Sequence, residues 1–252
     1  MTESIRDHPA IRLVGVSKSF YYYRRPHTTL RSGVIGKLSA GKSSRPPEPF
    51  EIRDLNLEVA RGESVALVGS NGSGKSTLLR LISGIYKPSR GRIETSGQVR
   101  AVIELGAGFH PELSGEENVS LYSAVLGMTR SELADNYDSI VEFADIRGVM
   151  ETPLKYYSSG MKARLAFAVA ICLNPDVLML DEVLAVGDLE FRERCRERLR
   201  NYSREGGTMI MVSHELDRLP ELCSRAIWLE NGQVVMSDTV ETVLEAFRSH
   251  SS

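Results

Sequence analysis

Apolar and polar positions along the chain recur in short runs that predict an α/β protein. Residues 11–23 and 50–59 alternate as half-buried strands do, whereas 63–69 is a β-branched run typical of a buried strand. Residues 77–86 have helical spacing and follow a Gly/Ser turn directly, which gives a strand, a turn and a helix in succession. Further strands are predicted at 92–96, 99–105, 176–180 and 206–213.

The stretch 114–173 is mostly helical in pattern and predicts a helical lobe between two α/β portions. Two helix starts in it carry capping boxes, in which a hydroxyl and a carboxylate each accept a backbone N–H: Ser114 with Glu117, and Thr129 with Glu132. After the α/β pattern returns, residues 225–236 predict a hairpin whose Asn231-Gly232 pair suits a type I′ turn. The charged run 192–200 interleaves arginine with glutamate, which favours a solvated helix face.

Composition limits the classes of partner. The net charge of −2, from 31 basic and 33 acidic residues, gives no global attraction to nucleic acid or anionic lipid. Three widely spaced cysteines favour neither a disulfide framework nor a zinc site, and they fit a reducing cytosol. The N-terminus lacks a signal-peptide core, and the longest apolar run, 165–173, is too short to span a bilayer. We therefore expect any membrane crossing to belong to another subunit.

The segment 24–49 is rich in Gly, Ser, Pro and basic residues and predicts a surface excursion. It contains a match to the phosphate-loop pattern G-x-x-x-x-G-K-[ST] at 36–43. No strand precedes this match, and the proline-rich residues after it cannot begin a helix. We reject it as a nucleotide site and interpret it as a basic surface loop.

A second match, at 69–76, has the strand before it and the helix after it that a phosphate loop requires. Its glycines let the backbone curl around phosphate, and the helix N-terminus adds positive potential. Lys75 is predicted to contact the β- and γ-phosphates, and Ser76 to offer its hydroxyl to Mg²⁺. We predict that ATP is held by the following residues: Gly69, Ser70, Asn71, Gly72, Ser73, Gly74, Lys75, Ser76 and Thr77.

Two carboxylates end the predicted buried strand at 177–180, and ligands bind at such strand ends in open α/β sheets. Asp181 is placed to hold Mg²⁺, and Glu182 to act as the general base for the water that attacks the γ-phosphate. An isolated acidic pair is commonly a surface turn, but the phosphate loop upstream favours catalysis. His214 follows another apolar strand and is predicted to sense the γ-phosphate at the same edge.

Phosphate loop, acidic strand end and histidine follow the order found in the nucleotide-binding subunits of ABC transporters, which this chain resembles over nearly its whole length. The residues at 157–161, Tyr-Ser-Ser-Gly-Met, look like a variant of the family's Leu-Ser-Gly-Gly-Gln signature, from which Ser159 and Met161 depart. Together with 104–118 and 181–188, this variant is similar to the branch that exports bacterial O-antigen, capsule and teichoic acid.

The resemblance implies a head-to-tail homodimer with two ATP molecules between the chains. Ser158 and Gly160 would contact the γ-phosphate held by the other subunit, and we assign Ser159 to the same loop site. Asp188 corresponds to the aspartate that crosses that interface, and Phe20 to the aromatic residue that stacks on adenine. A strand aromatic is the alternative interpretation of Phe20.

The resemblance also implies a transmembrane permease as partner. Phe109, His110 and Pro111 form the expected docking surface for it, with an ordinary turn of the lobe as the alternative. The excursion at 24–49 is hypothesised to contact the permease or the membrane surface. Glu104 is the nearest counterpart of the glutamine that joins Mg²⁺ to the helical lobe in the wider family, although a shift of one residue would put Leu105 there.

The predicted fold is that of a P-loop NTPase: an ABC-type ATPase core at about 10–103 and 174–252, with an antiparallel β subdomain and an inserted helical subdomain at about 104–173. Because the helical pattern at 239–250 is followed by only two residues, we expect no C-terminal carbohydrate-binding domain. We expect a peripheral ATPase, at the cytoplasmic face of the inner membrane, that powers export of a lipid-linked polysaccharide without touching it. The alternatives are the ATPase of an importer or drug exporter, a soluble ABC protein and a non-catalytic nucleotide-binding regulator.

Overall fold

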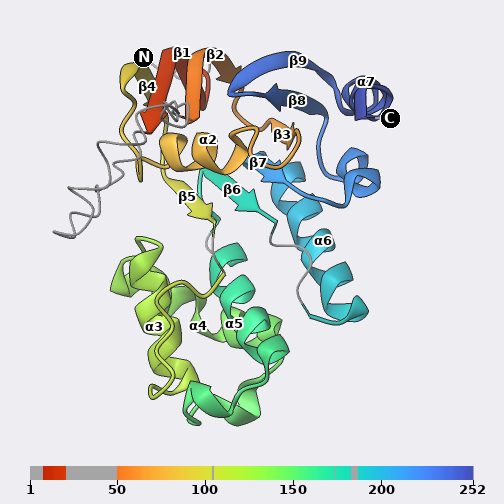
Figure 1. The fold of residues 1–252 in the computed structure, drawn as a ribbon. Helices are drawn as coiled ribbons and strands as arrows, with labels where there is room; N and C mark the ends of the chain where they lie inside the picture. Colours follow the sequence, from red (N-terminus) through yellow and green to blue (C-terminus); the bar gives the residue numbers. More distant parts are fainter. Residues whose placement is uncertain (1–7, 21–49, 104, 173, 183–186, 252) are drawn as a thin grey trace, which may run out of the picture.

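The described residues form two β-sheets with helices packed around them and a separate group of helices (Figure 1). The computed structural model describes residues 8–20, 50–103, 105–172, 174–182 and 187–251. The excursion at 24–49, with its rejected phosphate-loop match, and Glu104 lie outside these ranges.

The larger sheet carries the phosphate loop and the acidic strand end. Its six strands lie in the order β5 (Val99–Val102), β6 (Val177–Asp181), β7 (Thr208–Val212), β3 (Ser64–Val68), β8 (Arg225–Glu230) and β9 (Gln233–Thr239). The first five pair in parallel and β9 pairs antiparallel to β8. The strands β3 and β7 are buried along their whole length, which explains their continuous apolar runs. Both central turn residues of the β8–β9 hairpin have positive φ, Asn231 at 48° and Gly232 at 75°, as a type I′ turn requires.

The smaller sheet is antiparallel and three-stranded, in the order β2 (Phe50–Val59), β1 (Ile11–Phe20) and β4 (Arg90–Thr95). Its buried residues share one hydrophobic cluster with residues of the larger sheet and of helix α2 (Lys75–Ile82). The helix begins at Lys75 and ends at Ile82, earlier than the predicted 86. It stops there because Ser83 caps it and Gly84 takes a left-handed φ of 76°.

The helical group lies beyond the ends of β5 and β6 (Figure 1). It contains α3 (Gly115–Val125), α4 (Arg130–Ala144) and α5 (Ser159–Ile171), with short 3₁₀ turns at Arg147–Val149 and Leu154–Tyr156. Both predicted capping boxes are present at the starts of α3 and α4. Residues 165–171 of α5 are all buried, so this helix is the centre of the group.

Helix α6 (Leu189–Arg204) corrects one prediction. Its charged run is not wholly solvated, because Arg196 is only 4% exposed and lies beside the buried Cys195. The last helix, α7 (Val240–Ser251), packs near Trp228 of β8 through the ring of Phe247. None of the helices in the described ranges combines the length and the apolar character that a bilayer crossing requires.

Candidate nucleotide-binding and hydrolysis site

The predicted phosphate loop connects β3 to α2, at the carboxyl edge of the larger sheet. Gly74 has a φ of 111° and directly precedes α2, and Gly72 has a φ of 82°, so both occupy conformations that side chains disfavour. At Gly69 the reason for glycine is space, because a Cβ atom there would lie 2.2 Å from the carbonyl oxygen of Leu229. The loop is thus shaped by its glycines and by the neighbouring strand β8.

Lys75 lies inside this loop. Its Nζ donates to the carbonyl oxygens of Gly69 at 2.8 Å and Ser70 at 3.0 Å, and the residue is 8% exposed. Burial lowers the pKa of Lys75, while the charges of Glu182 and Asp181 act in the opposite direction. A partly desolvated cation held by two carbonyl oxygens is ready to exchange them for phosphate oxygens, which are stronger acceptors.

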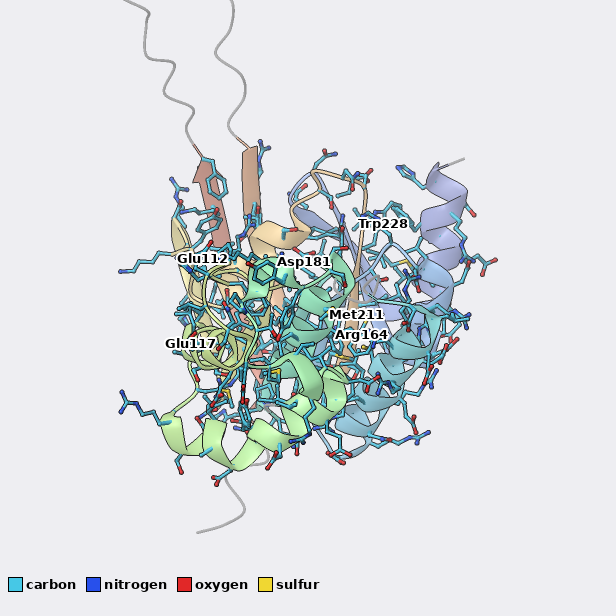
Figure 2. The ribbon with its side chains drawn as sticks, turned by 90° about the horizontal axis from the view of Figure 1, so that it is seen from below. Glu112, Glu117, Arg164, Asp181, Met211 and Trp228 are labelled. Atoms are coloured by element: carbon cyan, nitrogen blue, oxygen red, sulfur yellow. The ribbon has the colours of Figure 1, made fainter. Side chains whose placement is uncertain are left out.

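The loop and the acidic strand end share one pocket. It has a volume of about 290 Å³ and is lined by Asn71, Gly72, Gly74, Lys75, Ser76, Thr77 and Glu182. Glu182 therefore faces the residues predicted to hold the terminal phosphates, although more than 100 positions separate them in the sequence. Figure 2 shows Asp181 between Glu112 and Glu117 on one side of the view and Trp228 on the other.

Asp181 has the character expected of a Mg²⁺ ligand. Its Oδ1 is buried and has no hydrogen-bond partner among the described residues, and the residue ends a buried strand. An unpaired buried carboxylate oxygen is costly unless a cation or a donor satisfies it. With the hydroxyl of Ser76 in the adjoining pocket, Asp181 offers the oxygen ligands that Mg²⁺ prefers, so the residues present fit this ion.

Glu182 and His214 are in direct contact. The Nε2 atom of His214 lies 2.7 Å from Oε1 of Glu182, and the two side chains are 64% and 46% exposed. Glu182 has a φ of 57°, a strained value for a non-glycine residue, and its N–H donates to the carbonyl oxygen of Val212 at 2.9 Å. Because β6 and β7 are parallel neighbours, their carboxyl ends bring Glu182 and His214 together.

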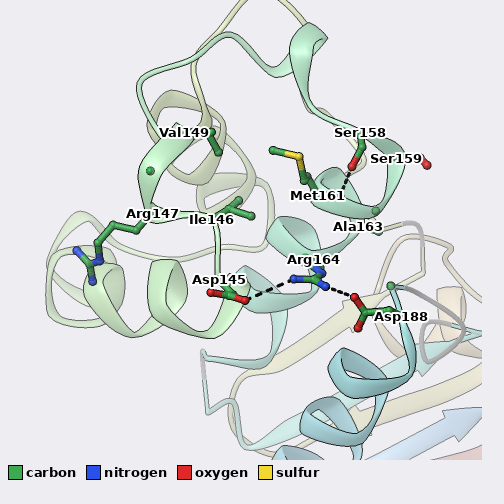
Figure 3. Close-up of a pocket in the computed structure, with 13 residues that line it drawn as sticks. Asp145, Ile146, Arg147, Val149, Ser158, Ser159, Met161, Ala163, Arg164 and Asp188 are labelled. Carbon is green, nitrogen blue, oxygen red and sulfur yellow. Dashed lines mark hydrogen bonds and ion pairs between the residues drawn. The ribbon is translucent and has the colours of Figure 1, made fainter.

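The signature residues lie in a different pocket. Ser158, Ser159, Gly160 and Asp188 line a cavity of about 980 Å³ between α5 and the start of α6, and none of its lining residues belongs to the phosphate loop (Figure 3). Ser158 is the N-cap of α5 and accepts the N–H of Met161 at 3.1 Å. The structure thus brings these four residues together but separates them from Lys75 and Glu182.

Asp188 is the N-cap of α6 and accepts the N–H of Phe191 at 2.9 Å. It also forms an ion pair with Arg164 of α5, which in turn lies 3.7 Å from Asp145 (Figure 3). The backbone hydrogen bond from Phe191, together with the positive charge of Arg164, lowers the pKa of Asp188. The carboxylate therefore stays ionised and keeps the start of α6 tied to the helical group.

Phe20 is not among the residues that line the phosphate-loop pocket. Its ring packs edge-on against Tyr86 with centroids 5.3 Å apart, and Nζ of Lys18 lies 5.2 Å from the Phe20 ring. The half-buried aromatic end of β1 thus has a cation and a second ring beside it.

The predicted docking turn is built around a buried residue that sequence reasoning missed. Asn118 of α3 is fully buried; its Oδ1 accepts the N–H of His110 at 2.7 Å, and its Nδ2 lies within 3.0 Å of three carbonyl oxygens. The ring of Phe109 packs edge-on against Tyr122 at 5.2 Å. A polar residue at an inward position of an amphipathic helix was the available signal for Asn118.

Comparison with known proteins identifies the family. The family model described as ABC transporter matches residues 52–185, which is more than half of the chain. The chain belongs to the ABC transporter family. The predicted ABC-type ATPase fold and the predicted enzyme class are both confirmed by this match, so this ABC chain is an ATPase.

The relatives of this ABC ATPase include export proteins. It is 36% identical to the O-antigen export system ATP-binding protein RfbB of Klebsiella pneumoniae over 96% of its own length and 98% of the relative. It is 36% identical to the teichoic acids export ATP-binding protein TagH of Bacillus cereus, over 95% of its length but only 42% of that protein. Among solved structures, an ATP-binding subunit of an ABC transporter matches with a TM-score of 0.73 at 22% identity, covering 95% of this chain and 93% of that one.

Proposed function

We propose that this ABC ATPase powers the export of a lipid-linked polysaccharide across the cytoplasmic membrane through a separate transmembrane permease. One observation carries the ATPase chemistry: Glu182 faces the phosphate-loop pocket while its carboxylate contacts His214 at 2.7 Å. The choice of substrate is supported by relatives named for O-antigen and teichoic acid export, at 36% identity over at least 95% of this chain.

In the proposed reaction, Glu182 accepts a proton from the water that attacks the γ-phosphate. Lys75 stabilises the charge that develops on the transferred group. His214 orients that group through the side of its ring that does not contact Glu182. Ser76 and Asp181 would hold Mg²⁺, which neutralises phosphate charge when it is bound. The positive φ of Glu182 supports this role, because strained backbone at a strand end commonly marks a residue placed for function.

The site is proposed to be completed by a second copy of the chain, with two ATP molecules between the copies. This proposal is supported by the separation of the signature pocket, with Ser158, Ser159, Gly160 and Asp188, from the phosphate-loop pocket. A γ-phosphate brought to the start of α5 by the partner would meet a helix N-terminus, which favours anions. A solved cassette with a TM-score of 0.70 at 21% identity, covering 91% of this chain and 98% of that one, is itself described as dimeric and bound to ADP and Pi.

The permease is proposed to dock on the turn formed by Phe109, His110 and Pro111. His110 and Pro111 are exposed, and the buried Asn118 holds the turn through a hydrogen bond from the backbone N–H of His110. Backbone hydrogen bonds connect this turn to the residues before the signature. The N–H of Leu154 donates to the carbonyl oxygen of Leu113, and the N–H of Lys155 donates to that of Pro111, both at 2.8 Å. Through this permease the ATPase would sit at the cytoplasmic face of the inner membrane, without contacting nucleic acid or the polysaccharide.

The division into a core at about 10–103 and 174–252 and a helical subdomain at about 104–173 is part of the same proposal, as are adenine stacking on Phe20 and ligation of Mg²⁺ by Glu104. Phe20 is supported by its neighbours, because Tyr86 and Lys18 would add a second ring and a cation beside a nucleobase.

The test is reconstitution. The chain is purified alone and together with a candidate transmembrane permease from the same organism, and phosphate release is measured with and without lipid-linked polysaccharide. The expected result is basal ATPase activity that the polysaccharide stimulates only in the complex. No phosphate release by the chain or its complex would contradict the ATPase role, and stimulation by small solutes in place of polysaccharide would contradict the substrate class.

A further inference from the structure

We infer that Arg196, buried within α6, is a positioning residue for His214: it holds Glu215, the next residue along the chain, and so keeps the histidine against Glu182. The inference rests on the proposed function, because it assigns a role to a side chain that does not touch the reacting atoms. Resemblance to the family did not point to it, and the interleaved charges of the run predicted a solvated position.

The environment of Arg196 requires carboxylate partners. The side chain is 5% exposed, and its Nη2 lies 3.4 Å from Oε2 of Glu215. Its Nη1 is paired with Glu193, one turn back on the same helix. A buried guanidinium without such partners is strongly destabilising, so the carboxylates must stay within reach of a cation that cannot move into solvent. Arg196 is therefore a fixed point to which Glu215 is attached.

The segment that carries His214 has few fixed points of its own. The imidazole is 64% exposed, so packing alone does not orient it, and the backbone on either side must. On the side of β7, the N–H of Glu215 donates to Oγ of Ser213 at 3.0 Å. On the other side, the N–H of Leu216 donates to the carbonyl oxygen of His214 at 3.0 Å. Leu216 packs against the hydrophobic core, and the Glu215 side chain adds a polar attachment of this turn to α6.

This arrangement gives α6 two tasks. Its N-cap, Asp188, lies in the signature pocket, and Arg196 lies about 12 Å further along the helix axis at about 1.5 Å per residue. A rigid helix thus connects the residue expected to meet the partner chain with the residue that steadies the γ-phosphate sensor. A displacement of the imidazole by about 1 Å is enough to lower the rate of a positioned reaction by up to about 100-fold.

The first experiment removes the charge of Glu215 without touching the buried arginine. Glu215 is half-exposed, so E215Q should fold normally. We expect kcat for ATP hydrolysis to fall by about 3- to 10-fold while KM stays within about twofold, because the phosphate loop is untouched. The matched control is E197Q, which removes an exposed carboxylate from the same helix without touching either partner of Arg196, and it should retain wild-type kcat.

The second experiment distinguishes positioning from simple stability. E215Q is placed in an H214A background, and single-turnover hydrolysis of radiolabelled ATP is measured so that the residual rate is resolved. If Glu215 acts through His214, E215Q slows the wild-type chain but has no further effect on H214A. An equal slowing in both backgrounds, or no slowing in either, overturns the inference and leaves the proposed function intact. An inactive wild-type chain contradicts the proposed function itself.

Discussion

At the carboxyl edge of the larger sheet, groups from three parallel strands meet within one chain: the phosphate loop after β3, Asp181 and Glu182 after β6, and His214 after β7. At the start of α5 the situation differs. There the Ser158 hydroxyl accepts a hydrogen bond from its own helix, Asp188 is paired with Arg164, and the surrounding cavity contains no phosphate-loop residue. In the proposed function, the first region supplies the groups for cleaving phosphate, and the second supplies a helix N-terminus that favours anions. The separation of the two regions within one chain supports the proposal that a second copy completes each site.

The largest expected effect on turnover comes from a substitution of Glu182, beside the phosphate loop. E182Q keeps the size of the side chain but removes the base, and we expect turnover to fall by about 100- to 1,000-fold with ATP binding retained. Because ATP then persists, the variant should form a dimer with ATP that elutes early in size-exclusion chromatography. E197Q, on the exposed face of α6, is the matched control and should behave as wild type. Normal turnover of E182Q would remove Glu182 from its proposed role.

The region at the start of α5 can be tested by mixing two inactive variants. S158R should reduce turnover by about 10- to 100-fold while ATP binding to the single chain is kept, because the phosphate loop is distant. Mixing S158R with E182Q creates dimers in which one site has both an intact base and an intact signature. Random pairing predicts recovery of about a quarter of wild-type activity in phosphate-release assays. A mixture that stays inactive would show that the two regions do not serve one site across an interface.

The proposed docking turn, residues 109–111, can be tested through the free energy of unfolding, where a smaller effect is expected. N118A removes a fully buried amide with four hydrogen bonds, and we expect a loss of about 2–3 kcal/mol in the free energy of unfolding. N136A is the control, since it removes one hydrogen bond at a half-buried position and should cost less than about 1 kcal/mol. Urea denaturation followed by circular dichroism compares the two. Equal losses would mean that Asn118 does not fix the turn.

The smallest effect on ATP hydrolysis is expected from replacing residues 31–46 with a short Gly/Ser linker. The segment contains the rejected phosphate-loop match, so soluble ATPase activity should be unchanged within about twofold. Export in cells should fail if the segment contacts the permease or the membrane surface. Unchanged export would refute that contact.

The helix starts and the hairpin turn could be predicted from the sequence, because they depend on residues that are adjacent in the chain. Both capping boxes and the Asn231-Gly232 turn are present because each is set by a few adjacent side chains. The order of the strands brought Glu182 to His214 as expected, since carboxyl ends of parallel strands share one edge.

What the sequence did not reveal depends on contacts between distant segments. Asn118 and Arg196 both lie on the inward side of a helix, and their polar partners lie in other segments, such as His110 and Glu215. Helical spacing identifies an inward position but not the residue that will satisfy a polar group there. The early end of α2 at Ile82 is a different case, because its signal is local: Gly84 takes a left-handed conformation, which overrode the apolar pattern that continues beyond it.

The hairpin turn between β8 and β9 has a consequence for biosynthesis. The N–H of Gly232 donates to the carbonyl oxygen of Ser73 at 3.0 Å, so the phosphate loop is braced by a turn that the ribosome makes more than 150 residues later. A nascent chain that has emerged only as far as α6 lacks this brace and the strand β8 beside Gly69. We therefore expect newly made chains to acquire affinity for ATP only near the end of translation, so that the nucleotide cannot assist the folding of the earlier segments.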